Sequence, residues 1–187
     1  SKILESDHGV NMLTTQTATT PTNATLSDVP AFNKHCVFRC SDSWFSVPAV
    51  SVREVVLAPE LVRFPSCHRA LAGLGHLRSE FVPVIALETL LNLQQRESRS
   101  ADDCLLVLEG NCVWSLLISE SAALQSLETI VSQESLAENT NNVVIGTAMF
   151  QDRIVRVLNP NGLLATAQHA FEQYWNEADG RINTMNS

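Results

Sequence analysis

From residue 35 to residue 158 the chain is a succession of short apolar runs separated by turn residues. This rhythm limits the fold more than any other feature of the sequence. Three pairs of runs are separated by only a few residues, which is typical of β-hairpins. The pairs are residues 36–40 with 44–47, 104–108 with 112–118, and 143–148 with 153–158. Strands at intervals of about 8–12 residues with little helix between them predict a barrel or a sandwich rather than βαβ units.

Further strands are expected between the first and second hairpins. Residues 51–57 are expected to form a strand, or a short helical turn followed by a strand, and residues 61–64 a short extended segment. Both are rich in apolar and β-branched side chains and are closed by prolines. The apolar run 81–87 is interrupted by Pro83. Because proline has no N–H to donate to a neighbouring strand, this run predicts an edge strand or a bulge.

Helices are predicted at few positions. Residues 66–71 are expected to form one helical turn, and residues 87–93 to end in a short helix. Pro160 is expected to open another short helix, because proline is favoured at the first helical position. The apolar spacing of residues 165–178 predicts a final amphipathic helix that stops at Gly180.

The composition divides the chain into three parts. Residues 1–34 hold seven threonines between Thr14 and Thr25 and few apolar side chains, so a flexible tail is predicted there. Residues 35–165 are expected to form the folded domain, and residues 166–187 the C-terminal helix and a tail. A length of 187 residues, 45% of them hydrophobic, is enough for one domain with a sizeable core.

Charge and cysteine content exclude several classes of function. The formal net charge of −8 argues against non-specific nucleic-acid binding and against attraction to anionic membranes. No run of 18 apolar residues and no signal-peptide core is found, so membrane insertion is not expected. Five scattered cysteines, an odd number, favour buried thiols in a reducing compartment. We therefore expect a cytoplasmic protein.

Motifs that carry catalysis are nearly absent. Gly73-x-Gly75 starts like a dinucleotide-binding loop, but Arg78 stands in place of the third glycine. Cys67 and His76 are candidates for a nucleophile and its base, with ordinary packing as the alternative. The cysteines lack the spacing of a metal site. No catalytic residue, metal or cofactor is therefore predicted.

Two stretches of the sequence resemble the CheW-like domain of bacterial chemotaxis. In the first, residues 52–55 (VREV) match the family's V-x-E-[VI] strand, and residues 73–87 (GLGHLRSEFVPVIAL) stand where N-L-R-G-x-[VIL]-[IV]-P-V-[IV]-D-L is expected. In the second, Ile145-Gly146 and residues 153–159 (RIVRVLN) stand where G-x-x…[LIV]-x-x-[IL]-[DN] is expected. The ordered series across both halves carries the resemblance.

The resemblance implies a mostly β fold of two small SH3-like five-stranded β-barrels packed side by side, followed by a C-terminal helix. It also implies an adaptor without enzyme activity. Such adaptors join the regulatory domain of a CheA-type histidine kinase to the cytoplasmic tip of a chemoreceptor, or serve type IV pilus and twitching motility. An unrelated small-barrel ligand-binding protein or enzyme is the alternative that the residues alone leave open.

The resemblance also assigns receptor- and kinase-binding positions. Val52 would line a groove between the barrels, and Glu54 and Arg78 correspond to positions that couple receptor and kinase. We hypothesise that Glu54 and Arg78 form an ion pair. Leu77 and Ser115 complete the predicted binding set.

Four departures from the family pattern bear on partner choice. They are Ser79, Ala86, Ser115 and Ser119. Ser79 replaces a glycine, so a strained turn is expected if that residue takes a positive φ.

Overall fold

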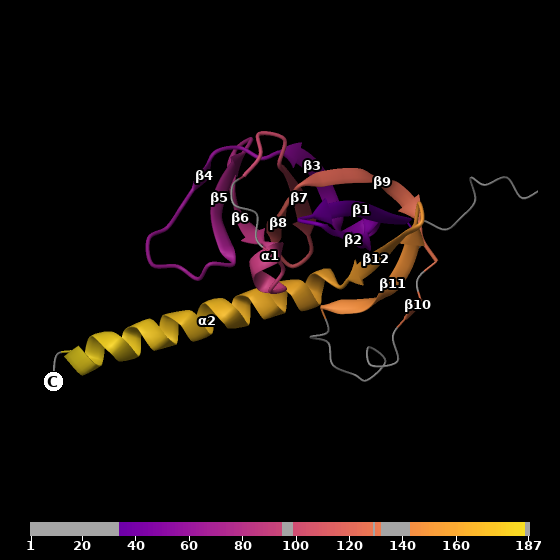
Figure 1. Cartoon of the computed structure of the whole chain (residues 1–187). Helices are drawn as coiled ribbons and strands as arrows, with labels where there is room; N and C mark the ends of the chain where they lie inside the picture. Colours follow the sequence, from indigo (N-terminus) through magenta and orange to yellow (C-terminus); the bar gives the residue numbers. More distant parts are fainter. Residues whose placement is uncertain (1–33, 95–98, 129, 132–142, 186–187) are drawn as a thin grey trace, which may run out of the picture.

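The computed structural model describes residues 34–94, 99–128, 130–131 and 143–185, and these form two β-sheets with a long helix running along them (Figure 1). The first sheet has the strand order β10-β11-β12-β2-β1-β9. Its strands are β1 (Lys34–Cys40), β2 (Ser43–Pro48), β9 (Glu120–Ser126), β10 (Ile130–Val131), β11 (Val144–Phe150) and β12 (Arg153–Leu158).

The second sheet has the order β3-β7-β8-β6-β5-β4. Its strands are β3 (Val52–Leu57), β4 (Leu61–Val62), β5 (Leu71–Leu77), β6 (Glu80–Ala86), β7 (Cys104–Glu109) and β8 (Val113–Ile118). A 3-10 turn, Ala49–Ser51, precedes β3, and helix α1 (Leu87–Leu90) follows β6. Helix α2 (Pro160–Met185) ends the described chain.

The two halves of the chain exchange hairpins. The β1–β2 hairpin joins β12 from the second half through a parallel β2/β12 contact. The β7–β8 hairpin joins β6 from the first half through a parallel β6/β8 contact. The same exchange continues outward, since β9 pairs with β1 and β3 pairs with β7. Each sheet therefore contains strands from both halves, which ties the sheets into one structure.

The predicted fold class is confirmed, with one correction to the barrels. The protein is mostly β, with two sheets and a C-terminal helix. Within the described residues neither sheet closes, because no pairing joins β10 to β9 or β3 to β4. Each sheet has six strands rather than five, and the sixth is the two-residue β4 or β10.

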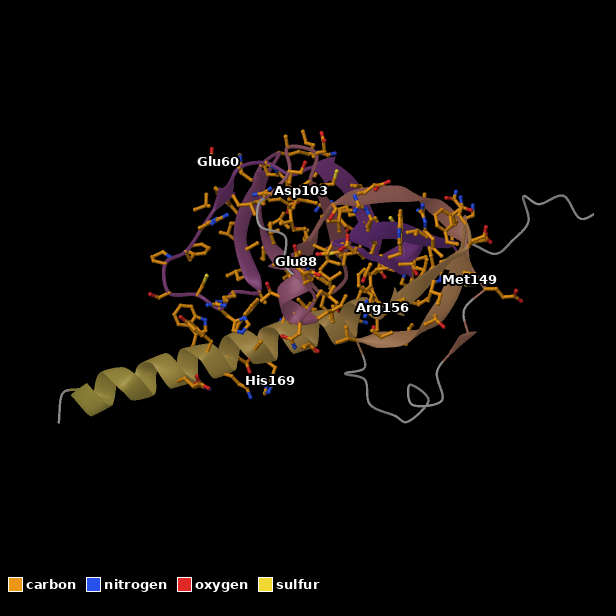
Figure 2. All side chains as sticks on the ribbon, viewed as in Figure 1. Glu60, Glu88, Asp103, Met149, Arg156 and His169 are labelled. Atoms are coloured by element: carbon orange, nitrogen blue, oxygen red, sulfur yellow. The ribbon has the colours of Figure 1, made fainter. Side chains whose placement is uncertain are left out.

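The two strands of the second hairpin, β7 and β8, are buried on both faces, which explains their nearly continuous apolar sequences. In β7, Leu106 and Leu108 face a central core shared by both sheets, whereas Leu105 and Val107 face a smaller cluster inside the second sheet. In β1, Phe38 faces the central core and stacks on Phe45 at 5.9 Å between ring centroids. The stick view shows side chains crowded between the sheets and against α1 (Figure 2). Each fully buried leucine contributes about 2 kcal/mol to folding.

Helix α2 is one continuous helix where two were predicted. The Asn159 side chain accepts the N–H of Asn161 at 3.1 Å, and Pro160 follows as the first helical residue. Leu163 and Ala167 enter the central core, so packing holds the two expected segments in one helix. The helix also passes Gly180, which does not stop it. Beyond α1 it extends past the second sheet (Figure 1).

Two further local predictions were wrong. Residues 66–71 form turns and the start of β5 instead of a helical turn. Strand β6 lies between β5 and β8 rather than at an edge, so the first of the two alternatives for Pro83 is wrong; the register of β5 on β6 does shift opposite Val84 and Ile85, directly after Pro83. Pro83 is accommodated because parallel pairing with β8 begins only at Val84, and the Pro83 carbonyl accepts the Ser115 hydroxyl at 3.1 Å. The predicted tail, apart from Lys34, lies outside the described residues.

Candidate partner-binding surface at strand β3

Strand β3 forms one edge of the second sheet and carries two of the predicted site residues. Among the strands that the structure describes, β3 pairs only with β7. Val52 begins the strand and packs, partly buried, against the central core. Glu54 is also partly buried, and only 21% of its side chain is exposed. Val52 and Glu54 therefore lie at the open edge of the sheet, but each side chain is partly buried.

The predicted ion pair between Glu54 and Arg78 is formed. The Arg78 Nη2 atom donates to Glu54 Oε2 at 2.8 Å, joining β3 to the turn between β5 and β6. The Arg78 side chain is 76% exposed, so water screens this pair strongly. A pair of this kind contributes at most about 1 kcal/mol to stability. Its main effect is to fix the position of the turn beside β3.

A second ion pair, in which β3 supplies the arginine rather than the glutamate, lies next to the first. Arg53 Nη1 contacts Glu80 Oε1 at 2.6 Å, so β3 supplies one cation and one anion, and the β5–β6 turn supplies their counterparts. The register of β3 on β7 shifts between Val52 and Glu54, which makes Arg53 a bulge residue. A bulge re-aims side chains, and here it lets two consecutive residues reach the same turn.

We call these four residues, Arg53, Glu54, Arg78 and Glu80, the β3 clamp. Arg53 and Glu80 were not among the predicted site residues. The V-R-E motif and the glutamate that follows the turn were the available signals, but the register shift that unites them is visible only in the fold.

The turn that carries Arg78 is held in a strained conformation. Leu77 pairs with Glu80, so Arg78 and Ser79 alone connect the two strands. Arg78 has a φ of 56°, in the left-handed region, whereas Ser79 does not have a positive φ. The expected strain is therefore present, but one residue earlier than predicted. A left-handed non-glycine residue costs about 1–2 kcal/mol, and the clamp helps to hold it.

Exposed apolar side chains flank the clamp. Leu57, on the outward face of β3, is 66% exposed, and Phe81, the residue after Glu80, is 61% exposed. The Phe81 ring packs on His76 at 4.9 Å between ring centroids. A charged clamp beside exposed apolar residues is typical of a surface that receives another protein.

The remaining predicted site residues lie inside the second sheet. Leu77 is partly buried and packs on the cluster that contains Leu105. Ser115 is completely buried in β8, where its hydroxyl is bonded to the Pro83 carbonyl. Ser115 therefore presents no surface to a partner, and its role in this structure is to satisfy the carbonyl of a proline within the sheet.

Cys67 and His76, the candidate nucleophile and base, make contacts that are typical of ordinary packing. The Cys67 thiol donates to the backbone carbonyl of Phe64 at 3.3 Å, and His76 is engaged with Phe81. Gly73 and Gly75 both lie within strand β5, where no helix follows to bind a phosphate. In the part of the chain that the structure describes, no group of three His, Cys, Asp or Glu side chains is arranged to hold a metal.

A second exposed apolar surface lies on the first sheet. Met149 of β11 is 59% exposed and Ile154 of β12 is 68% exposed. The two residues are direct partners across the hairpin, so their side chains form one continuous apolar patch. By contrast, the apolar residues of β7 and β8 are almost all buried. We call this pair the β11–β12 patch.

Comparisons with known proteins agree with this architecture. The chain resembles the crystal structure of the scaffolding protein TtCheW from Thermoanaerobacter tengcongensis, with a TM-score of 0.61 and 19% sequence identity, over 70% of this chain and 91% of that chain. At this identity the likeness shows the fold alone. No curated protein sequence matches the chain. Among the described residues, no helix has the length and apolar character needed to cross a membrane.

The family profile of the CheW-like domain matches residues 34–168, which is well over half of the chain. The matched segment begins at the first residue of β1 and ends inside α2, and so includes both sheets. The protein belongs to the CheW-like domain family of chemotaxis scaffolds, a family without enzyme activity.

Proposed function

We propose that this protein is a cytoplasmic adaptor that joins the regulatory domain of a CheA-type histidine kinase to the cytoplasmic tip of a chemoreceptor. One observation carries the proposal beyond family membership. The resemblance assigns coupling roles to Glu54 and Arg78, and the structure brings their side chains to 2.8 Å on an exposed edge of a sheet. Because such an exposed pair adds little stability, its place at an open sheet edge favours a role in binding.

The receptor would bind at the β3 clamp. A receptor tip is a helical hairpin, and such a helix binds a protein surface through apolar anchors flanked by charges. Val52 and Leu57 offer apolar contacts along β3. The guanidinium of Arg78 is largely exposed, so an acidic side chain of the receptor helix is able to reach it without breaking the core. The clamp would thereby determine the orientation of the bound receptor helix more than its affinity for the protein.

The kinase would bind at the β11–β12 patch. Adaptors of this family contact the kinase through an apolar barrel edge, and either the second or the third hairpin could supply that edge. The structure favours the third hairpin, because Met149 and Ile154 are exposed there while the apolar residues of the second hairpin are buried. Apolar residues at the centre of an interface supply most of its affinity.

Separate variants test the two surfaces by calorimetric titration. The binding partners are the kinase regulatory domain and a receptor-tip fragment from the same organism. Arg78→Glu should weaken receptor binding at least about tenfold and leave kinase binding unchanged. The double variant Met149→Ser/Ile154→Ser should show the reverse pattern.

Matched controls keep this test specific. Arg63→Glu makes the same charge change on an exposed arginine outside the clamp, and Val62→Ser removes a side chain that is 53% exposed on β4. Both controls should bind like the wild type. Folded wild-type protein that binds neither partner would overturn the proposal, as would an Arg78→Glu variant that binds the receptor fragment normally.

A further inference from the structure

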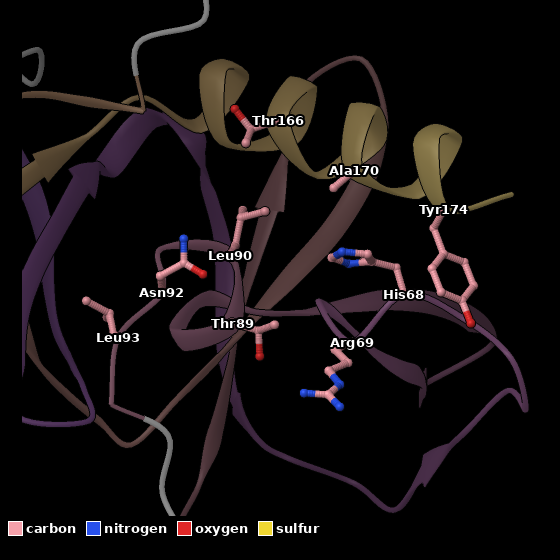
Figure 3. Close-up of a pocket in the computed structure, with 9 residues that line it drawn as sticks. All are labelled: His68, Arg69, Thr89, Leu90, Asn92, Leu93, Thr166, Ala170 and Tyr174. Carbon is pink, nitrogen blue, oxygen red and sulfur yellow. The ribbon is translucent and has the colours of Figure 1, made fainter. Parts of the chain in front are cut away.

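A cavity of about 720 Å³ lies between α2, α1 and the loop that precedes β5, apart from the β3 clamp and the β11–β12 patch (Figure 3). The loop contributes His68 and Arg69, and α2 contributes Thr166, Ala170 and Tyr174. Helix α1 and the turn after it supply the remaining lining residues, which are Thr89, Leu90, Asn92 and Leu93. A volume of this size suits a small organic molecule.

The cavity has a polar end with free hydrogen-bond donors. His68 Nδ1 accepts the backbone N–H of Ala70 at 3.1 Å, so a neutral His68 carries its proton on Nε2. The His68 ring also packs against Phe171 and Tyr174, each at 5.9 Å between ring centroids, which fixes its orientation. Figure 3 shows this ring directed beneath α2, with the Arg69 guanidinium on the opposite side of the cavity from the helix.

The charge of the lining is opposite to that of the whole protein. The chain carries 20 acidic and 12 basic residues, yet none of the described residues that line this cavity is a carboxylate. Among the described residues, Arg69 makes no ion pair that would neutralise it. An uncompensated guanidinium with a neighbouring imidazole N–H is the donor set that binds carboxylates and phosphates in proteins.

Apolar side chains in the lining are interspersed with polar ones. Leu90 and Leu93, from α1 and the following turn, lie near Thr89 and Asn92, and Ala170 of α2 lies above the His68 ring (Figure 3). We infer that this cavity binds a small organic anion, whose carboxylate or phosphate group contacts Arg69 and His68 and whose apolar part contacts Leu90, Leu93 and Ala170. Because the lining comes from three elements, a bound anion would also hold α2 against the loop before β5.

The inference is tested on the full chain with three probes of nearly equal size: phenylacetate, phenyl phosphate and the neutral phenylacetamide. Amide chemical shifts in NMR spectra and the thermal unfolding midpoint are followed during titration. One or both anions should bind with a Kd of about 1 mM or tighter and move the signals of His68, Arg69 and Tyr174. They should also raise the midpoint, because the ligand binds only the folded state. The tighter anion identifies the headgroup.

Variants separate a specific site from general binding. Arg69→Gln should weaken the anions about tenfold, whereas Arg63→Gln, an exposed arginine of the same loop outside the cavity, should have no effect. Ala170→Leu should fill the part of the cavity above His68 and abolish binding, with circular dichroism confirming that the variant is folded. Equal binding of phenylacetamide, unchanged binding by Arg69→Gln, or no saturable shifts in the cavity with either anion would overturn the inference.

Discussion

Replacing Gly73 by alanine should destabilise the protein strongly, although Gly73 lies in the middle of a strand. Gly73 has a φ of +145°, which side chains of L-residues rarely adopt. A Cβ atom at this position would lie 2.6 Å from the carbonyl oxygen of Val62 and 3.2 Å from the Cβ of Leu61. Both contacts belong to β4, so the clash is relieved only if β4 moves away from β5.

The expected loss of stability in Gly73→Ala has two contributions. The unfavourable backbone conformation costs about 1–3 kcal/mol. Displacing the two-residue strand β4 removes its backbone hydrogen bonds to β5, each worth about 1 kcal/mol. We therefore expect the free energy of unfolding to fall by about 3–5 kcal/mol.

Gly75, two residues later in the same strand, is the matched control. Its φ is not in the positive region, and the nearest contact of an added Cβ is the Leu105 Cδ1 atom at 3.2 Å, the end of a flexible side chain. Gly75→Ala should lower the free energy of unfolding by about 1–2 kcal/mol, less than Gly73→Ala, because only the buried Leu105 side chain has to shift by a few tenths of an ångström.

Urea unfolding and thermal unfolding, both followed by circular dichroism, measure both variants. For a chain of this length, a loss of 1 kcal/mol lowers the thermal midpoint by about 2–4 °C, so the two variants should be easily distinguished. If Gly73→Ala costs less than about 1 kcal/mol, or no more than Gly75→Ala, then the close approach of β4 does not explain the glycine.

Three further predictions concern single features of the fold. Burial lowers the pKa of His35, so the unfolded chain binds a proton more readily than the folded protein does. The free energy of unfolding should therefore fall as the pH drops below about 6.5, the pKa of an unburied histidine. His35→Gln should flatten this pH dependence in urea titrations at several pH values. Gln151 and Asp152 both have positive φ in the β11–β12 turn, at 47° and 60°, so replacing them by Asn-Gly should stabilise the protein by about 1 kcal/mol in the same assay; a less stable variant would contradict this. The buried Ser119 hydroxyl has no hydrogen-bond partner within the described structure, so Ser119→Ala should be neutral or up to about 1 kcal/mol more stable by thermal unfolding, and a clear loss would reveal a partner for it.

The candidate binding surface was predictable only in part. The Glu54–Arg78 pair followed from the resemblance, because both residues occupy positions of the family motifs. Arg53 and Glu80 did not follow, because their contact depends on the register shift of β3 on β7. Ser115 was placed in the binding set by its motif position, but both faces of β8 are buried, and Ser115 is completely buried with them.

The cavity beneath α2 likewise could not be predicted from the sequence alone. His68 and Arg69 are neighbours in a loop, and Tyr174 lies about a hundred residues later on α2. The sequence indicates that residues 165–178 form an amphipathic helix, but not which loop its aromatic side chains will meet. That meeting depends on Leu163 and Ala167 docking α2 into the central core.

The sequence by itself determined the local elements. Short apolar runs separated by turn residues located the three hairpins, and Pro160 located the start of α2, because turn residues and the fixed φ of proline act within a few residues of the chain. Tertiary structure decided which sheet each hairpin joins. The parallel contacts of β2 with β12 and of β6 with β8 unite residues far apart in the chain, and nothing within a short apolar run identifies the distant strand with which it pairs.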